Sequence, residues 1–284
     1  MKVIQRRKGN KEYFYLKHSF RDNGKVITRE KYLGEVIPKN IDEIKEEMKK
    51  EENKVTYAKL EKIKNNFQNE WKKIPETVKE KEKQEIAIAF TYNTNAIEGS
   101  TITLEETREI IHDKISPNRP LRDVKETEAH SKVFLKMLDE KEEILNELLL
   151  KWHKEIFSET KPSIAGKYRD YLVRVGLYIA PDWQDVKKLM DDLIIFINKS
   201  KVNPVELSAR AHYKFERIHP FGDGNGRIGR LIINHILWHN KYPMLIIEYK
   251  KRNAYYKALN GDEEYFKNYF IRRYLTVHRK LYIK

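Results

Sequence analysis

The spacing of apolar residues differs between three parts of the chain. In the first part, aromatic and β-branched residues gather at Tyr13–Leu16 and again at Val26–Thr28. The Asp22-Asn23-Gly24 sequence between them is a strong turn sequence, and an earlier turn is expected at Gly9-Asn10. Residues 1–38 are therefore predicted to form a small antiparallel β-sheet that ends near Pro38.

In the second part, residues 39–84, apolar residues recur at helical spacing on a background dense in Lys and Glu. This pattern predicts one long helix, or a pair of helices, with a solvated surface and a break near Pro75. We interpret these residues as a charged helical linker.

The third part, residues 85–284, is predicted to be one mainly α-helical domain. Residues 86–90 are apolar on almost every side, which predicts a buried helix over 85–99 that stops at Gly99. Thr103 and Glu106 form a capping box for the next helix. Further helices are expected at about 123–139, 141–157, 183–198, 204–218, 228–238 and from 251 onward. The β-branched and aromatic stretch between Gly166 and Pro181 predicts a short β-hairpin within this helical domain.

Composition narrows the classes of function. The 284 residues contain no cysteine, which excludes disulfides, thiolate zinc sites and a cysteine nucleophile. The net charge of +14 is compatible with nucleic-acid binding, but the lysines are spread along the chain and also suit an ordinary solvated surface. No apolar stretch is long enough to cross a bilayer, and the N-terminus lacks the apolar run of a signal peptide. We therefore expect a cytoplasmic protein that has no membrane attachment.

The densest chemistry lies in the run from His219 to Arg227, His-Pro-Phe-Gly-Asp-Gly-Asn-Gly-Arg. Pro220 disfavours helical geometry in the residue before it, so the preceding helix is expected to end at His219. The segment Gly224-Asn225-Gly226 leads into a new helix, whose free amides and dipole favour an anion. A base, an acidic residue and a phosphate cradle in one loop indicate chemistry on a nucleotide phosphate.

This run, together with Arg230, resembles the signature of the Fic (Fido) family. Members of that family share an α-helical core and mostly transfer AMP from ATP to a protein hydroxyl. The resemblance implies that His219 is the general base and that Asp223 holds Mg²⁺. It further implies that Gly224, Asn225, Gly226 and Arg227 bind the phosphates of ATP and that Arg230 reaches the terminal phosphate.

Other stretches extend the resemblance. Gly166-Lys167-Tyr168-Arg169 matches a family feature that precedes a β-hairpin flap. By resemblance, Val175, Gly176, Leu177 and Tyr178 of the flap, with Tyr255 and Tyr256, would wall the nucleotide.

The segment Thr94-Asn95-Ala96-Ile97-Glu98-Gly99 resembles the inhibitory motif of the family. In that motif, Thr94, Glu98 and Gly99 are the matching positions, and Glu98 would pair with Arg230 and displace the γ-phosphate. The implied protein is an autoinhibited adenylyltransferase that modifies a Ser, Thr or Tyr hydroxyl on itself or on another protein. A homodimer is common among relatives.

Three alternatives remain open. Family members also remove AMP or transfer UMP, phosphocholine or phosphate. His212, Glu216 and His219 have helical spacing that could hold a metal in a hydrolase, although Pro220 ends the helix beside His219. A nucleic-acid-binding regulator could instead act through the basic N-terminal sheet, which carries Arg6, Arg7, Lys8, Lys17 and Arg21.

Overall fold

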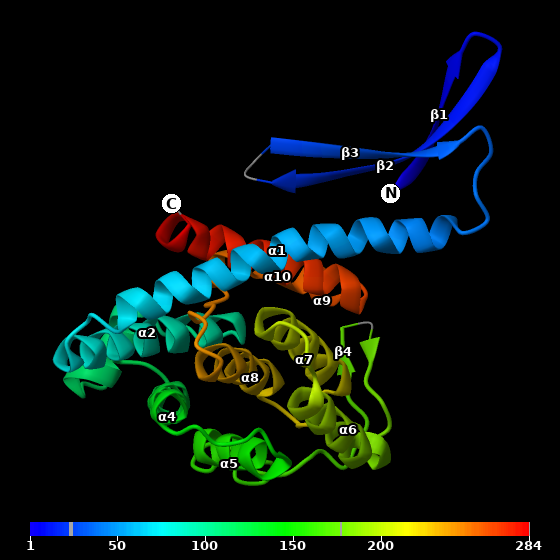
Figure 1. The fold of residues 1–284 in the computed structure, drawn as a ribbon. Helices are drawn as coiled ribbons and strands as arrows, with labels where there is room; N and C mark the ends of the chain where they lie inside the picture. The colour runs from blue at the N-terminus through cyan, green and yellow to red at the C-terminus, as the bar shows by residue number, and fades with distance from the viewer. Residues whose placement is uncertain (23–24, 177, 284) are drawn as a thin grey trace. The chain divides into compact units, whose positions relative to one another are not determined.

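The computed structural model describes residues 1–22, 25–176 and 178–283, and it is mostly helical (Figure 1). The chain divides into two compact units, Met1–Lys59 and Leu60–Lys284. Small antiparallel sheets accompany the helices, as the apolar pattern predicts. Among the described residues, no helix combines the length and the apolar character needed to cross a bilayer.

The first unit contains a three-stranded antiparallel sheet in the order β1-β2-β3. Its strands are β1 (Lys2–Lys8), β2 (Lys11–Asp22) and β3 (Lys25–Gly34). The predicted turn at Gly9-Asn10 joins β1 to β2, while Asn23 and Gly24 of the other predicted turn lie outside the described residues. Leu16, in the middle strand, is fully buried.

Helix α1 (Ile41–Trp71) begins in the first unit and ends in the second. The second unit holds the remaining helices and one hairpin. They are α2 (Glu76–Ile97), α3 (Leu104–Arg108), the π-helix η1 (Glu109–Asp113), α4 (Leu121–Asp139), α5 (Asn146–Phe157), β4 (Arg174–Val175), β5 (Tyr178–Ile179), the 3₁₀-helix η2 (Trp183–Asp185), α6 (Val186–Lys199), α7 (Pro204–Ile218), α8 (Asn225–His239), the 3₁₀-helix η3 (Tyr249–Lys251), α9 (Arg252–Leu259) and α10 (Glu263–Tyr282).

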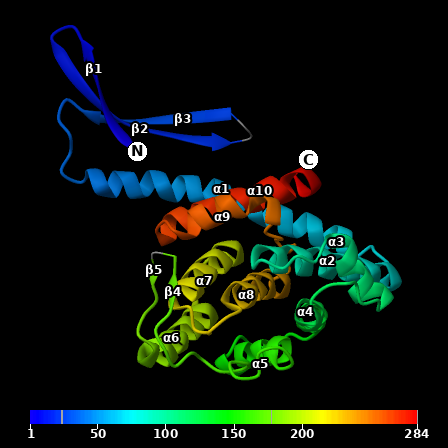
Figure 2. The ribbon, with the colours of Figure 1, turned by 180° about the vertical axis from the view of Figure 1, so that it is seen from behind.

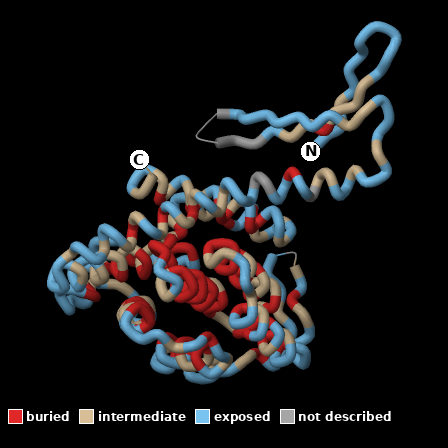
Figure 3. Tube along the Cα trace, viewed as in Figure 1, coloured by how far each residue is buried: buried red, intermediate tan, exposed pale blue. Residues whose placement is uncertain are grey.

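Helix α8 forms the centre of the second unit. It contacts α2, α4, α5 and α7, and these helices surround it in both views (Figures 1 and 2). Ile228, Leu231 and Ile232 are fully buried, and Figure 3 shows the helix as a nearly continuous buried segment. Burial on all sides holds α8 firmly, so a loop at its N-terminus has a rigid base.

Helix boundaries follow the local capping chemistry. The capping box of Thr103 and Glu106 is present at α3, and the Asn203 side chain caps α7 ahead of Pro204, as predicted. Three boundaries differ from prediction. Helix α2 starts at Glu76, directly after the predicted break at Pro75, rather than near residue 85, so the last residues of the predicted linker belong to this helix. Helix α5 starts at Asn146 rather than near residue 141, because Leu145 is extended and the adjacent Ile144 is buried in the core. Helix α8 starts at Asn225 rather than Ile228.

Candidate active site

The loop between α7 and α8 begins with a backbone reversal at His219. This residue has φ 51° and ψ 60°, the left-handed conformation, and its N–H donates to the Phe215 carbonyl at 2.9 Å. A left-handed residue is a common way to end a helix, and Pro220 prevents helical geometry here. His219 is thereby turned out of the helix, as its position before proline predicts.

Arg169 holds this reversal from outside the loop. Its side chain is only 4% exposed, and its guanidinium donates to the carbonyls of His219 at 2.9 Å, Tyr171 at 2.8 Å and Pro181 at 2.6 Å. Its own N–H donates to the Pro220 carbonyl at 2.9 Å. Arg169 therefore fastens the segment before the hairpin to the base of the loop.

The middle of the loop is anchored by Phe221 and Asn225. Phe221 is fully buried, and its ring stacks on His153 with the centroids 4.0 Å apart. The Asn225 side chain accepts from the N–H of Phe221 and donates to its carbonyl, both at 2.9 Å. Because both ends of this amide are occupied by the loop, the Asn225 side chain braces the backbone.

His153 is a structural histidine that supports the loop. Its Nδ1 accepts from the Gly166 N–H at 2.9 Å, so its Nε2 carries the proton and donates to the Asp223 carbonyl at 3.0 Å. Burial lowers the pKa of His153 to about 4, which keeps the ring neutral.

Two glycines allow close approach at the start of α8. A Cβ on Gly224 would lie 2.4 Å from the Phe157 ring, and Gly224 also has φ 80°. A Cβ on Gly226 would lie 2.1 Å from Oε1 of Glu98 and 2.9 Å from a guanidinium nitrogen of Arg230. The glycine pattern that predicts a phosphate cradle thus also admits Glu98 to the helix N-terminus.

An ion-pair network surrounds Asp223. Lys161 Nζ lies 2.7 Å from Oδ2 of Asp223 and 2.9 Å from Oε1 of Glu126. Arg227 pairs with Glu126 and lies 3.7 Å from Oδ1 of Asp223. Burial raises the pKa of Asp223. The hydrogen bond from Lys161 and the charge of Arg227 lower this pKa by a larger amount, so the net pKa lies below its usual value. Asp223 is therefore ionised at neutral pH.

Two members of this network, Glu126 and Lys161, are not identified by the sequence analysis. Glu126 lies on α4 and Lys161 follows α5, far from the loop in the chain. The sequence carries no local signal for these contacts, because the burial of Glu126 on α4 is seen only in the structure.

Arg230 is buried in contact with the end of α2. It is 2% exposed, and one of its terminal nitrogens donates to Oε1 of Glu98 at 2.6 Å. Its Nε donates to Oγ1 of Thr94 at 2.6 Å. Gly99 follows in the left-handed conformation at φ 92° and lets the chain leave the helix at this point. The structure therefore brings Thr94, Glu98 and Arg230 together.

The remaining predicted residues lie at two places. Val175 and Tyr178 are paired across the hairpin, and the Tyr178 hydroxyl donates to the Arg217 carbonyl at 2.7 Å. Gly176 forms the turn between them, and Leu177 lies outside the described residues.

Tyr255 and Tyr256 face different surroundings on α9. The Tyr255 side chain is buried, and its hydroxyl lies 2.7 Å from Nε2 of His212. The Tyr256 hydroxyl donates to the Ile97 carbonyl at 2.9 Å, next to Glu98. Tyr256 therefore adjoins the end of α2, whereas Tyr255 belongs to the interior.

A metal site at His212, Glu216 and His219 has no support in the structure. Within the described parts of the chain, no three His, Asp or Glu side chains are grouped to hold a metal ion. Burial raises the pKa of Glu216 to about 8, so this carboxyl is protonated at neutral pH and is a poor ligand. Burial also lowers the pKa of His219, which keeps its imidazole in the neutral form that a base requires.

The fold and the site define a class: a helical domain that presents a neutral histidine and an acidic residue in a loop leading to a helix N-terminus. Residues 143–237 match the model of the Fic/DOC family, so this segment of the chain is similar to that family.

Named relatives and solved structures agree with this similarity. The chain is 34% identical over 177 residues to "Protein adenylyltransferase Fic" of Nematostella vectensis, a match that covers 60% of this chain and 42% of the relative. It is 30% identical over 200 residues to "Protein adenylyltransferase fic-1" of Caenorhabditis elegans, with 66% and 39% covered. The chain thus spans less than half the length of these relatives.

Among solved structures, Fic-1 from C. elegans matches with a TM-score of 0.69 at 26% identity, over 82% of this chain and 72% of that one. A Fic family protein from Desulfovibrio desulfuricans G20 matches with a TM-score of 0.66 at 26% identity, over 79% and 73%.

Proposed function

We propose that this chain is a protein adenylyltransferase that transfers AMP from ATP to a Ser, Thr or Tyr hydroxyl of a protein. The observation that carries the proposal is the loop from His219 to Arg227, which joins a buried base to a helix N-terminus through a braced backbone. The names of the relatives support the choice of AMP as the transferred group.

His219 would start the reaction by taking the proton of the target hydroxyl. The hydroxyl oxygen then bonds to the α-phosphorus of ATP, and the bond from that phosphorus to its bridging oxygen breaks. Pyrophosphate leaves with the electron pair of the broken bond. The lowered pKa of His219 supports this role, because the neutral ring is available as an acceptor.

The phosphates would be held by the start of α8. The amides of Gly224, Asn225 and Gly226 lie at a helix N-terminus, where anions are stabilised, and Arg230 would meet the terminal phosphate once Glu98 is displaced. Asp223 fits a magnesium ion, because it is ionised and its side chain is 45% exposed. Magnesium, when bound, would neutralise charge on the phosphates and on the departing pyrophosphate.

Autoinhibition would follow from the contact between Glu98 and Arg230. Arg230 is 2% exposed and the Glu98 side chain is 28% exposed, so separating them leaves a buried guanidinium without its anion. Removing one partner of a buried pair costs about 3–5 kcal/mol, and partial exposure of Glu98 puts this pair at the lower end. About 3 kcal/mol is a factor of more than 100 in an equilibrium constant. That factor would suffice to keep most molecules inactive.

Intact-mass analysis after incubation with ATP and Mg²⁺ tests reaction and regulation together. We expect the wild type to gain little mass and Glu98→Gly to gain one or more AMP groups. Glu98→Gly combined with His219→Ala should gain none, because the base is absent. Glu82→Gly, at an exposed position of the same helix, is the matched control and should behave as the wild type. No AMP on Glu98→Gly, alone or with candidate target proteins, would count against the proposal.

A second role in nucleic-acid binding is favoured by one face of the N-terminal sheet. Residues 1–34 contain ten Lys and Arg against three Asp and Glu. Strand register puts Tyr13, Tyr15 and Tyr32 on one face, where the Tyr15 and Tyr32 rings are 5.3 Å apart and the Arg6 guanidinium lies 4.9 Å from the Tyr15 centroid. Aromatic rings among cations are the features by which sheets bind single-stranded nucleic acid.

A further inference from the structure

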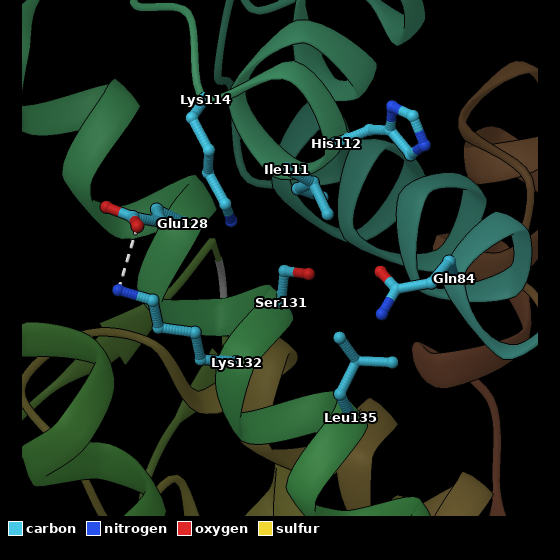
Figure 4. A pocket seen from close by; sticks show the side chains of 8 residues that line it. All are labelled: Gln84, Ile111, His112, Lys114, Glu128, Ser131, Lys132 and Leu135. Carbon is cyan, nitrogen blue, oxygen red and sulfur yellow. Dashed lines mark ion pairs between the residues drawn. The ribbon is translucent and has the colours of Figure 1, made fainter. Parts of the chain in front are cut away.

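A cavity of about 370 Å³ lies between α2, η1 and α4 (Figure 4). Its volume is in the range of sites that bind small molecules. None of its lining residues belongs to the loop between α7 and α8. Its lining includes Gln84, Ile111, Lys114, Glu128, Ser131 and Leu135.

The floor of the cavity contains an unpaired hydroxyl. Ser131 is only 2% exposed, and its Oγ has no hydrogen-bond partner. Nearly all buried polar groups in folded proteins are hydrogen-bonded, so such an atom calls for an explanation. In Figure 4 the Ser131 hydroxyl points into the same space as the Lys114 ammonium and the Gln84 amide. Ser131 Oγ exposes less than 1 Å² in this conformation, so it gains a partner only when an occupant of this space shifts the wall enough to reach it.

Lys114, an exposed residue at the rim of the cavity, has an unusual backbone. The π-helix η1 ends at Lys114, which has φ 60° and ψ 31° and is one of three non-glycine residues with positive φ in the described chain. π-Helical turns and left-handed non-glycine residues are both costly and cluster at functional sites. Among the described residues, no carboxylate lies within ion-pair distance of Lys114, whereas the neighbouring Lys132 pairs with Glu128 at 2.8 Å.

These features define the chemistry of the ligand. One ammonium in excess of the acidic groups, with a hydroxyl and an amide beside it, suits a carboxylate or phosphate oxyanion. Ile111 and Leu135 line the same cavity and suit an apolar body. We propose that this cavity binds a small organic anion with one oxyanion group and a compact apolar part.

The cavity walls are also the helices that hold Glu98 in place. Helix α2 carries Gln84 in the wall and Thr94 near its C-terminal end. Helix α4 fastens α2 by contacts from His130 to Thr91 at 3.1 Å and from Thr127 to Asn95 at 3.2 Å. His130 directly precedes Ser131.

The cavity and the contact between Glu98 and Arg230 are present in the same conformation. A ligand favours the conformation that it binds best. The regulatory consequence follows if release of Glu98 shifts α2 against α4 and so distorts the cavity: the bound anion then favours the closed position of Glu98. This regulatory consequence rests on the proposed transferase function, whereas binding itself does not.

Binding is tested on the full chain by ligand-observed NMR and calorimetry, with phenyl phosphate and benzoate as probes and benzamide as the neutral analogue. Both anions should bind and benzamide should not. Lys114→Gln and Ser131→Ala should each weaken binding about tenfold or more. Lys136→Gln, the same change at an exposed site on α4, should leave it unaltered. Circular dichroism should find Ser131→Ala at least as stable as the wild type, because its hydroxyl has no partner to lose.

Regulation is tested by AMP transfer in the presence of phenyl phosphate. Transfer by the wild type should fall further, while Glu98→Gly should be unaffected, because it has no closed state to favour. Anion binding that is unchanged by Lys114→Gln and Ser131→Ala would overturn the site, and so would the absence of binding. Binding with equal inhibition of both proteins would overturn the regulatory role alone. Loss of transfer in every variant without ligand would instead count against the transferase function.

Discussion

Gly226 is the residue that most directly permits the contact between Glu98 and Arg230. A Cβ at this position would be 2.1 Å from the Glu98 carboxylate, although the helical backbone there accommodates any residue. We predict that Gly226→Ala lowers stability by about 1–3 kcal/mol, the usual effect of overpacking. For a unit of this size, thermal denaturation should show a fall in Tm of roughly 2–4 °C per kcal/mol.

A double-mutant cycle identifies the cause of that loss. In the Glu98→Gly background the clash with the carboxylate is removed and only the end of the flexible Arg230 side chain remains close, so adding Gly226→Ala should cost much less than it does in the wild type. Equal losses in the two backgrounds would mean that the alanine acts on something other than Glu98.

The pKa of His219 leads to a prediction about pH. Burial disfavours the imidazolium form and lowers this pKa below its usual value of about 6.5, while the charge of Glu98 raises it. The neutral base therefore persists at lower pH, and activity is lost as pH falls through the lowered pKa. In Glu98→Gly, the acid limb of the rate of AMP transfer should lie below pH 6.5. Asp223, with its lowered pKa, does not titrate in this range. An acid limb at or above pH 6.5 would contradict this role.

The Asn225 side-chain amide braces the turn between α7 and α8 from within. Asn225 is 2% exposed and satisfies both backbone groups of Phe221. We predict that Asn225→Ala lowers the free energy of unfolding by about 1–3 kcal/mol, because two buried polar groups lose their partner. AMP transfer should fall as well, since the loop geometry is lost. Asn240→Ala, at the exposed C-terminal end of α8, is the matched control for denaturation and activity.

Structural features that are determined by residues close together in the chain could be predicted from the sequence. The α3 capping box, the Asn203 cap and the backbone reversal at His219 each depend on residues within four positions of one another. The two-residue strands β4 and β5 also follow from local β-branched and aromatic content. The start of α5 could not be predicted, because the burial of Ile144 depends on the packing of the whole unit.

The difference between local and long-range causes also decides which residues of the candidate active site could be predicted from the sequence. Glu98 and Arg230 were paired from the sequence only because both belong to motifs of a known family. Lys161 and Glu126 belong to no such motif, and their contacts with Asp223 and Arg227 depend on how α4, α5 and α8 pack. A charged residue carries no local mark of its distant partner, so long-range ion pairs require the structure.

At the scale of the whole molecule, the two compact units suggest two separable activities. We predict that the full chain binds single-stranded oligonucleotides through its N-terminal sheet and that log K falls linearly with log salt concentration. Tyr32 is 54% exposed, and stacking of one base on a tyrosine contributes about 1–3 kcal/mol. Fluorescence anisotropy should therefore show binding weakened roughly tenfold by Tyr32→Ala.

Tyr265→Ala is the matched control, because Tyr265 is a similarly exposed tyrosine on α10 of the second unit. It should leave oligonucleotide binding unchanged. His219→Ala should also leave binding unchanged while it removes AMP transfer, and Tyr32→Ala should do the reverse. If Tyr32→Ala leaves binding as unchanged as Tyr265→Ala does, the net charge of the whole chain, rather than the tyrosine face of the sheet, accounts for the affinity. The sheet would then have no specific part in nucleic-acid binding, and its aromatic cluster would serve only to stabilise the three strands.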